Sequence, residues 1–191
     1  MDANWEMQNN QSDESTNFIY KCDTLEECLN QISENKVDKD YALHRWYNYK
    51  TSTSCEYFFC DYGAVHEEDI YKHDIDIYIN DIPFDVKLTI YPAKLSDRPY
   101  NLKTRTGKNK MIEWFYANQS QQARKQMLNR LYVVCDGGNQ EESLKMKSDF
   151  STIRKRVKAF MEYSLKKGIN RIQIKDGDCG YNLFSDVIYI I

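Results

Sequence analysis

Three of the four aspartates within residues 73–89 are expected on one face of a strand pair together with Lys87, and they are Asp74, Asp76 and Asp85. In both halves of this segment, polar residues alternate with Ile, Phe, Val or Leu, which predicts two half-buried strands. Carboxylate oxygens are ligands that Mg²⁺ prefers, and a nearby ammonium group can orient a water or stabilise charge on a phosphate. These residue types therefore predict a site for metal-assisted hydrolysis.

The two strands are expected to form a hairpin around Asn80 and Asp81, since both side chains tolerate a left-handed backbone. This register places Asp76 opposite Asp85, with Cβ atoms roughly 5 Å apart. Like charges at that distance destabilise a sheet unless a cation lies between them. The alternative is a solvated sheet face with ordinary exposed ion pairs, although aspartate is a poor strand former.

The arrangement of Asp76 followed by Asp85-Val86-Lys87 resembles the core motif of the PD-(D/E)xK nuclease superfamily, which has the restriction-endonuclease-like fold. The resemblance covers about residues 40–175, and His73 stands where the family often has proline.

The resemblance implies that Asp76 and Asp85 bind Mg²⁺, or Mn²⁺ in its place, together with the main-chain carbonyl of Val86. Lys87 would position a water or stabilise developing charge. Asp74 would replace Asp76 as the first acid if the hairpin register slipped.

Many members of this superfamily carry a further glutamate on the helix before the hairpin, and Glu56 fits that position. Thr53 and Glu56 also form a capping-box pattern at the start of a predicted helix over 53–62, which ends at Gly63. Glu56 therefore has two alternative roles, as a supporting catalytic residue or as a helix-capping residue.

A group of polar residues between 95 and 129 is predicted to contact nucleic acid. Residues 95–110 are expected to form a long basic loop and residues 111–129 a helix, and basic side chains beside a metal site suit a phosphate backbone. The candidates are Lys103, Arg105, Lys108, Lys110, Gln119 and Gln122. A mobile solvated loop is the alternative.

The predicted elements define an α/β fold in which a mixed β-sheet carries helices on both faces, with N-terminal helices before a restriction-endonuclease-like core. Residues 1–16 are expected to form a flexible acidic and polar tail, and residues 17–191 a single domain. The other predicted helices cover 24–35, 41–49 and 143–167, and the other predicted strands 130–135, 171–175 and 186–191.

The formal net charge is −3, with −7 in residues 1–40 (ten acids, three bases) and +4 in the remainder (nineteen acids, twenty-three bases). Residues 41–191 are therefore mildly basic, whereas residues 1–40 are acidic. No apolar run approaches the ~20 residues that span a bilayer. Six cysteines without zinc spacing indicate reduced thiols and a cytoplasmic protein.

The resemblance, together with the acidic hairpin, implies a metal-dependent endonuclease that hydrolyses phosphodiester bonds. The resemblance favours DNA over RNA and a role in restriction or host defence. The alternative is a catalytically inactive module with the same fold, which binds nucleic acid or a partner protein. A homodimer is compatible with either prediction, and no membrane association is expected.

Overall fold

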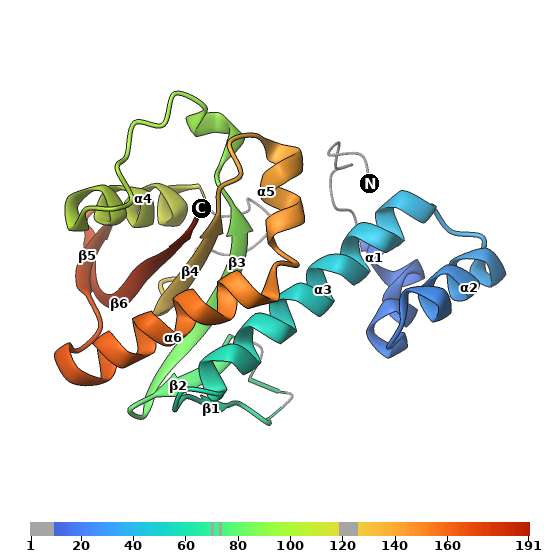
Figure 1. Ribbon diagram of the computed structural model, residues 1–191, viewed down its shortest axis with the longest axis horizontal. Coiled ribbons are helices and arrows are strands. Elements are labelled where there is room, and N and C mark those ends of the chain that lie inside the picture. Colours follow the sequence, from blue (N-terminus) through green and yellow to red (C-terminus); the bar gives the residue numbers. More distant parts are fainter. Residues whose placement is uncertain (1–9, 70, 73, 119–125) are drawn as a thin grey trace. The chain divides into compact units, whose positions relative to one another are not determined.

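The computed structural model describes residues 10–69, 71–72, 74–118 and 126–191 of the chain (Figure 1). The chain forms two compact units, one ending at Thr53 and the other running from Ser54 to Ile191. The boundary falls inside one continuous helix, α3 (Lys39–Cys60), where the sequence predicted two helices. This arrangement differs from the predicted tail over 1–16 followed by a single domain.

The first unit is helical and consists of α1 (Asn10–Ser15), the 3₁₀ helix η1 (Asn17–Lys21), α2 (Leu25–Asn35) and the first part of α3. The predicted capping box at the start of α2 is confirmed, because Thr24 and Glu27 each cap the other's main-chain amide. A small core holds these helices together and contains Ile19, Cys22, Cys28, Ile32, Ala42 and Leu43.

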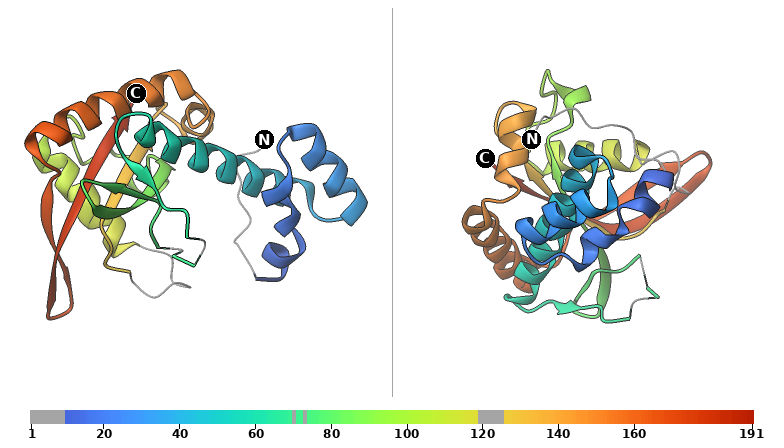
Figure 2. Two further views of the ribbon diagram at one scale, coloured as in Figure 1. Left: turned by 90° about the horizontal axis from the view of Figure 1, so that it is seen from below. Right: turned by 90° about the vertical axis from the view of Figure 1, so that its right-hand side faces the viewer.

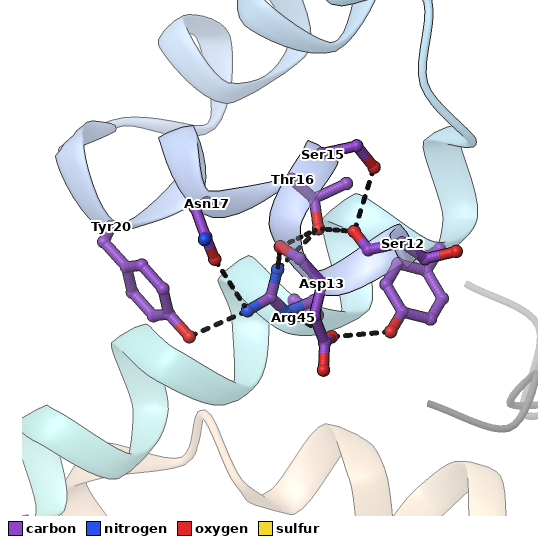
Figure 3. A network of polar contacts seen from close by, with 8 residues as sticks. Ser12, Asp13, Ser15, Thr16, Asn17, Tyr20 and Arg45 are labelled. Atoms are coloured by element: carbon purple, nitrogen blue, oxygen red, sulfur yellow. Dashed lines mark hydrogen bonds and ion pairs between the residues drawn. The ribbon is translucent and has the colours of Figure 1, made fainter. Parts of the chain in front are cut away.

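Arg45 on α3 connects α1 and η1 to the rest of the first unit (Figure 3). Its Nη1 donates to the carbonyl of Asp13 at 2.6 Å and to Thr16 Oγ1 at 2.5 Å, and its Nη2 donates to the Tyr20 hydroxyl at 2.9 Å. The predicted tail is therefore helical from Asn10 to Ser15.

The second unit is built on a six-stranded mixed sheet, which confirms the predicted α/β class. The strand order is β1-β2-β3-β4-β6-β5; β3, β4 and β6 are mutually parallel, and the remaining pairs are antiparallel. The strands are β1 (Val65–His66), β2 (Ile77–Ile79), β3 (Ile82–Ile90), β4 (Arg130–Cys135), β5 (Arg171–Asp176) and β6 (Cys179–Ile190). Figure 2 shows the β5–β6 hairpin extending past the end of β4.

Helices cover both faces of this sheet, as predicted (Figure 1). On one face, Phe59 of α3 and Met161 of α6 (Phe150–Lys167) are fully buried against Val86 and Leu131 of the sheet. On the other face, α4 (Arg105–Ala117) packs on the sheet through residues that include Met111, Ile112 and Tyr116. All six residues of β4 are buried, as expected for a strand covered on both sides.

Some helix boundaries differ from the prediction, and side-chain caps account for the starts of α4 and α6. Thr104 accepts a hydrogen bond from the Gly107 amide at 3.1 Å, so α4 begins at Arg105 inside the predicted loop. Asp149 caps α6 through the Thr152 amide, which divides the predicted helix 143–167 into α5 (Gln140–Met146) and α6. The 3₁₀ helix η2 (Ala93–Leu95) lies between β3 and α4.

The predicted hairpin register between β2 and β3 is confirmed. Ile77 pairs with Phe84 and Ile79 pairs with Ile82, which leaves Asn80 and Asp81 as the two turn residues. Their φ angles are 50° and 63°, as the mirror-image type I turn requires. Among the described residues, no helix has the length and apolar character needed to cross a bilayer.

Candidate functional site

The hairpin brings the two predicted acids together. Asp76 directly precedes β2, and its amide donates to the carbonyl of Phe84 at 2.9 Å, so the antiparallel pairing continues to this residue. Its carboxylate Oδ2 accepts a hydrogen bond from the Val86 amide at 2.6 Å. Asp76 is thereby fixed beside the Asp85-Val86-Lys87 segment, as the register predicted.

Asp85 is buried and lies between two cations. Its Oδ1 is 2.5 Å from Lys87 Nζ, and its Oδ2 is 2.8 Å from Arg130 Nε. The Lys87 side chain is half exposed, whereas Arg130 is buried and its guanidinium lies 5.6 Å from the centre of the Tyr116 ring.

Arg130 was not predicted as a site residue. It reaches Asp85 because β3 and β4 are parallel neighbours in which these two residues are register partners. The two positions are 45 residues apart, and no local pattern indicates their register.

Glu56 lies in the interior of α3, so its interpretation as a helix-capping residue is wrong. Its side chain is mostly buried, and its Oε2 lies 3.4 Å from Nε2 of His66 on β1. The His66 ring stacks on Tyr57, with ring centres 4.8 Å apart. This histidine was not predicted as a site residue, because the two-residue strand β1 that positions it has no clear sequence pattern.

Burial and neighbouring charges change the pKa values of two acids at this site. Burial, together with the negative charge of Asp76, raises the pKa of Glu56 to about 8. Burial and the neighbouring Asp85 raise the pKa of Asp76 to about 6, although the Val86 amide opposes this change. Lys87 favours the charged form of both groups. Glu56, Asp76, Asp85 and Lys87 therefore form one electrostatic unit, called the hairpin cluster below.

The chemistry of the hairpin cluster fits a hard cation, because its donors are carboxylate oxygens. Among the described residues, however, no three acidic, histidine or cysteine side chains are already grouped to hold a metal ion. Both oxygens of Asp85 contact basic side chains. A cation would therefore bind Asp85 beside these two basic groups or would replace one of them.

Asp74 lies outside the contacts of the hairpin cluster. It is exposed, and its Oδ1 accepts a hydrogen bond from Gln126 Nε2 at 2.8 Å. The confirmed register places Asp76 at the cluster, so Asp74 is not needed as the substitute acid.

The predicted basic residues do not form one loop. Arg105 and Lys108 lie on α4 and converge on Asp186, with nitrogen-to-oxygen distances of 2.9 and 3.6 Å. Lys103 lines a surface groove together with Arg105, Lys108 and Asp186, and Lys110 is exposed on α4. Gln119 and Gln122 lie outside the described residues.

The chain matches no protein-family model, no curated protein and no solved structure. The fold and the site define an α/β protein with an acidic, lysine-containing hairpin cluster, and its function is inferred from that geometry.

Proposed function

We propose that this protein is a divalent-metal-dependent nuclease and that the hairpin cluster is its active site. The observation that carries the proposal is the close grouping of Asp76, Asp85 and Lys87 around the Val86 amide, beside the buried Glu56. The raised pKa values of Glu56 and Asp76 support it: burial is their main cause and neighbouring carboxylates add to it, and a bound cation would favour the charged form of both acids.

In this proposal Asp76, Asp85 and the Val86 carbonyl hold Mg²⁺ or Mn²⁺, and Glu56 contributes directly or through a water. The cation lowers the pKa of a bound water and offsets phosphate charge. Lys87 orients the attacking water or stabilises charge that develops on the phosphate. Its half-exposed side chain can reach both Asp85 and an incoming substrate.

The substrate class in this proposal is a nucleic acid, with DNA favoured over RNA by analogy alone. Lys103, Arg105, Lys108 and Lys110 would contact the phosphate backbone. Arg105 and Lys108 pair with Asp186 on β6, which is separated from Asp85 on β3 by β4. A cytoplasmic location is part of the proposal, because the six cysteines are free thiols.

The test is cleavage of single-stranded and double-stranded DNA and RNA with Mg²⁺, Mn²⁺ or EDTA. Asp76→Asn keeps an oxygen that can accept from Val86, so it should fold. Lys87→Met removes a half-exposed ammonium while Asp85 keeps its buried partner Arg130, so it should fold as well. We expect each to lower metal-dependent cleavage at least 100-fold. Asp81→Asn makes the same charge change in the exposed turn and should retain activity. Full activity in Asp76→Asn or Lys87→Met would exclude this site.

A second candidate function is a catalytically inactive module that binds nucleic acid or a protein. The observation that favours it is the occupation of both Asp85 oxygens by Lys87 and Arg130, which neutralises this acid without a metal. This function predicts that no nucleic acid is cleaved with either metal. It also predicts that thermal unfolding of the protein is insensitive to millimolar Mg²⁺.

A further inference from the structure

A surface groove of about 600 Å³ is lined by residues of α4, α6, β6 and the segment that precedes α4. This volume is in the range of small-molecule binding sites. The β6 residues beneath it are largely buried, so the side chains that a ligand can reach come mainly from the two helices. The groove is called the basic groove below, and its accessible lining includes Lys103, Arg105, Lys108, Arg156, Phe160 and Tyr163.

Helix α6 contributes both a cation and an aromatic ring to the basic groove. Arg156, Phe160 and Tyr163 follow one another in steps of four and three residues, so they share one face of the helix. Tyr163 is 57% exposed, whereas the Phe160 ring packs edge-on against Phe59, with ring centres 6.1 Å apart. The positions of Arg156 and Tyr163 are about 10 Å apart along the helix axis. One small ligand can therefore contact both side chains.

The Arg156 guanidinium is available to an anion. Two other basic residues of α6 are already paired, since Arg154 contacts Asp61 at 3.3 Å and Lys158 contacts Glu162 at 3.9 Å. Arg156 is exposed and has no acidic partner in the part of the chain that the structure describes. Its five donors in a planar fork match the oxygens of a phosphate group.

Helix α4 adds two cations that share a single carboxylate. Arg105 Nη1 lies 2.9 Å from Asp186 Oδ2, and Lys108 Nζ lies 3.6 Å from Asp186 Oδ1. Burial lowers the pKa of Lys108 and the charge of Arg105 adds to this change, although Asp186 opposes it. An anion bound in the basic groove would favour the charged form of Lys108. This end of the groove is therefore suited to a phosphate group.

We propose that the basic groove binds a nucleotide, with its phosphate at the basic side chains and its base stacked on Tyr163. Stacking on an aromatic ring accepts every base, because every base has a flat π-face. The nucleotide can be a free mononucleotide or one unit of a single strand, since both supply a phosphate and a base. The site does not require the hairpin cluster to be catalytic; if that cluster is a nuclease active site, the bound nucleotide would be one unit of its substrate.

An acidic peptide fits the basic groove less well than a nucleotide does. Its carboxylates would meet the basic side chains, but its main chain would need amides and carbonyls to pair with. Val187 and Ile190 of β6 are fully buried and Ile188 is nearly so, which leaves no free strand edge beneath the groove. A ligand that binds through a charged group and a flat ring needs no such edge.

The test is isothermal titration calorimetry with the full chain in EDTA, which prevents metal-dependent cleavage. Adenosine 5′-monophosphate or thymidine 5′-monophosphate should bind with a Kd below 1 mM. The matching nucleoside and inorganic phosphate should each bind at least tenfold more weakly, because each supplies only half of the contacts. Asp76→Asn should bind the nucleotide normally, so a failure of the nuclease proposal leaves this result unchanged.

Two variants of α6 separate the two halves of the site, and each has a matched control. Arg156→Gln should weaken nucleotide binding at least fivefold, whereas Lys155→Gln, outside the groove lining, should change it less than twofold. Tyr163→Ala should weaken nucleotide binding at least fivefold and leave the affinity for inorganic phosphate unchanged. Tyr71→Ala removes an 83% exposed tyrosine outside the groove and should have no effect.

A four-nucleotide single strand distinguishes the two sources of the ligand. Binding at least tenfold tighter than the mononucleotide, with the same losses in both variants, would assign the groove to a strand, and equal affinity would assign it to a free nucleotide. The nucleotide site is excluded if neither ligand binds at 1 mM, if the nucleoside or inorganic phosphate binds equally well, or if the variants match their controls. Binding of a hexaglutamate peptide in place of nucleotide would also overturn it and would indicate a protein partner.

Discussion

Arg130 and Asp85 form a buried ion pair between adjacent parallel strands, with Arg130 Nε 2.8 Å from Asp85 Oδ2. Each side chain is less than a tenth exposed, so neither charge can be solvated by water if its partner is lost. The pair joins the candidate active site to β4 and makes the position of Asp85 depend on the packing of the sheet.

Removing one member of this pair should be costly. We expect Arg130→Met to lower the free energy of unfolding by about 3 kcal/mol, because a buried charge loses one of its two partners. Urea unfolding followed by circular dichroism would measure the change. The double variant Arg130→Met/Asp85→Asn should lose less than the sum of the single variants, and strict additivity would contradict a direct interaction.

The stability of the protein should fall as the pH rises from about 4.5 to about 8. Glu56 has a folded-state pKa of about 8 against 4.5 as its ordinary value, so the folded state binds more protons than the unfolded state in this window. The stabilisation is therefore fully present below the ordinary pKa and is lost as the pH passes the folded-state pKa. Thermal unfolding at pH 5 and pH 8 would measure the slope.

Glu56→Gln is the matched variant for this pH dependence. It should be more stable than the unsubstituted protein at pH 8 and should show a much shallower decline between pH 5 and pH 8. If the substitution leaves the pH profile unchanged, Glu56 is not the titrating group. Under the proposed function, Mg²⁺ should also raise the unfolding temperature more at pH 8 than at pH 5.

Arg45 should control the order of the first helices. Arg45→Lys keeps the positive charge but loses the planar fork that contacts Asp13, Thr16 and Tyr20 together. We expect hydrogen exchange of the amides in residues 10–21 to increase at least tenfold, with little change in residues 126–191. Lys50→Ala is the control, because its partner Asp23 is almost fully exposed and such pairs contribute little.

Gly107 should be required for the start of α4. A Cβ atom at this position would lie only 2.0 Å from the carbonyl oxygen of Asn101. Gly107→Ala should therefore lower the free energy of unfolding by about 2 kcal/mol and shift Arg105 and Lys108 away from Asp186. Lys110→Ala, on an exposed position of the same helix, should change stability by less than about 0.5 kcal/mol. Equal effects in a denaturation experiment would exclude the close contact.

The sequence by itself determined the features that depend on neighbouring residues. The alternation of polar and apolar side chains with a two-residue turn predicted the register from Ile77 to Phe84, and the Thr24 pattern predicted the start of α2. The apolar run of β4 was predicted with its observed bounds. In each case the signal lies within a few residues, where backbone preferences and side-chain period act directly.

Only the tertiary structure decided which distant residues meet. The pairing of Asp85 with Arg130, the contact of Glu56 with His66 and the convergence of Arg105 and Lys108 on Asp186 all join separate elements. Parallel strands joined by long connections carry no turn that fixes their register, so packing of the whole sheet sets it. The sequence therefore predicted the opposed acids and Lys87 of the hairpin, but not the buried Arg130 that pairs with Asp85 from β4.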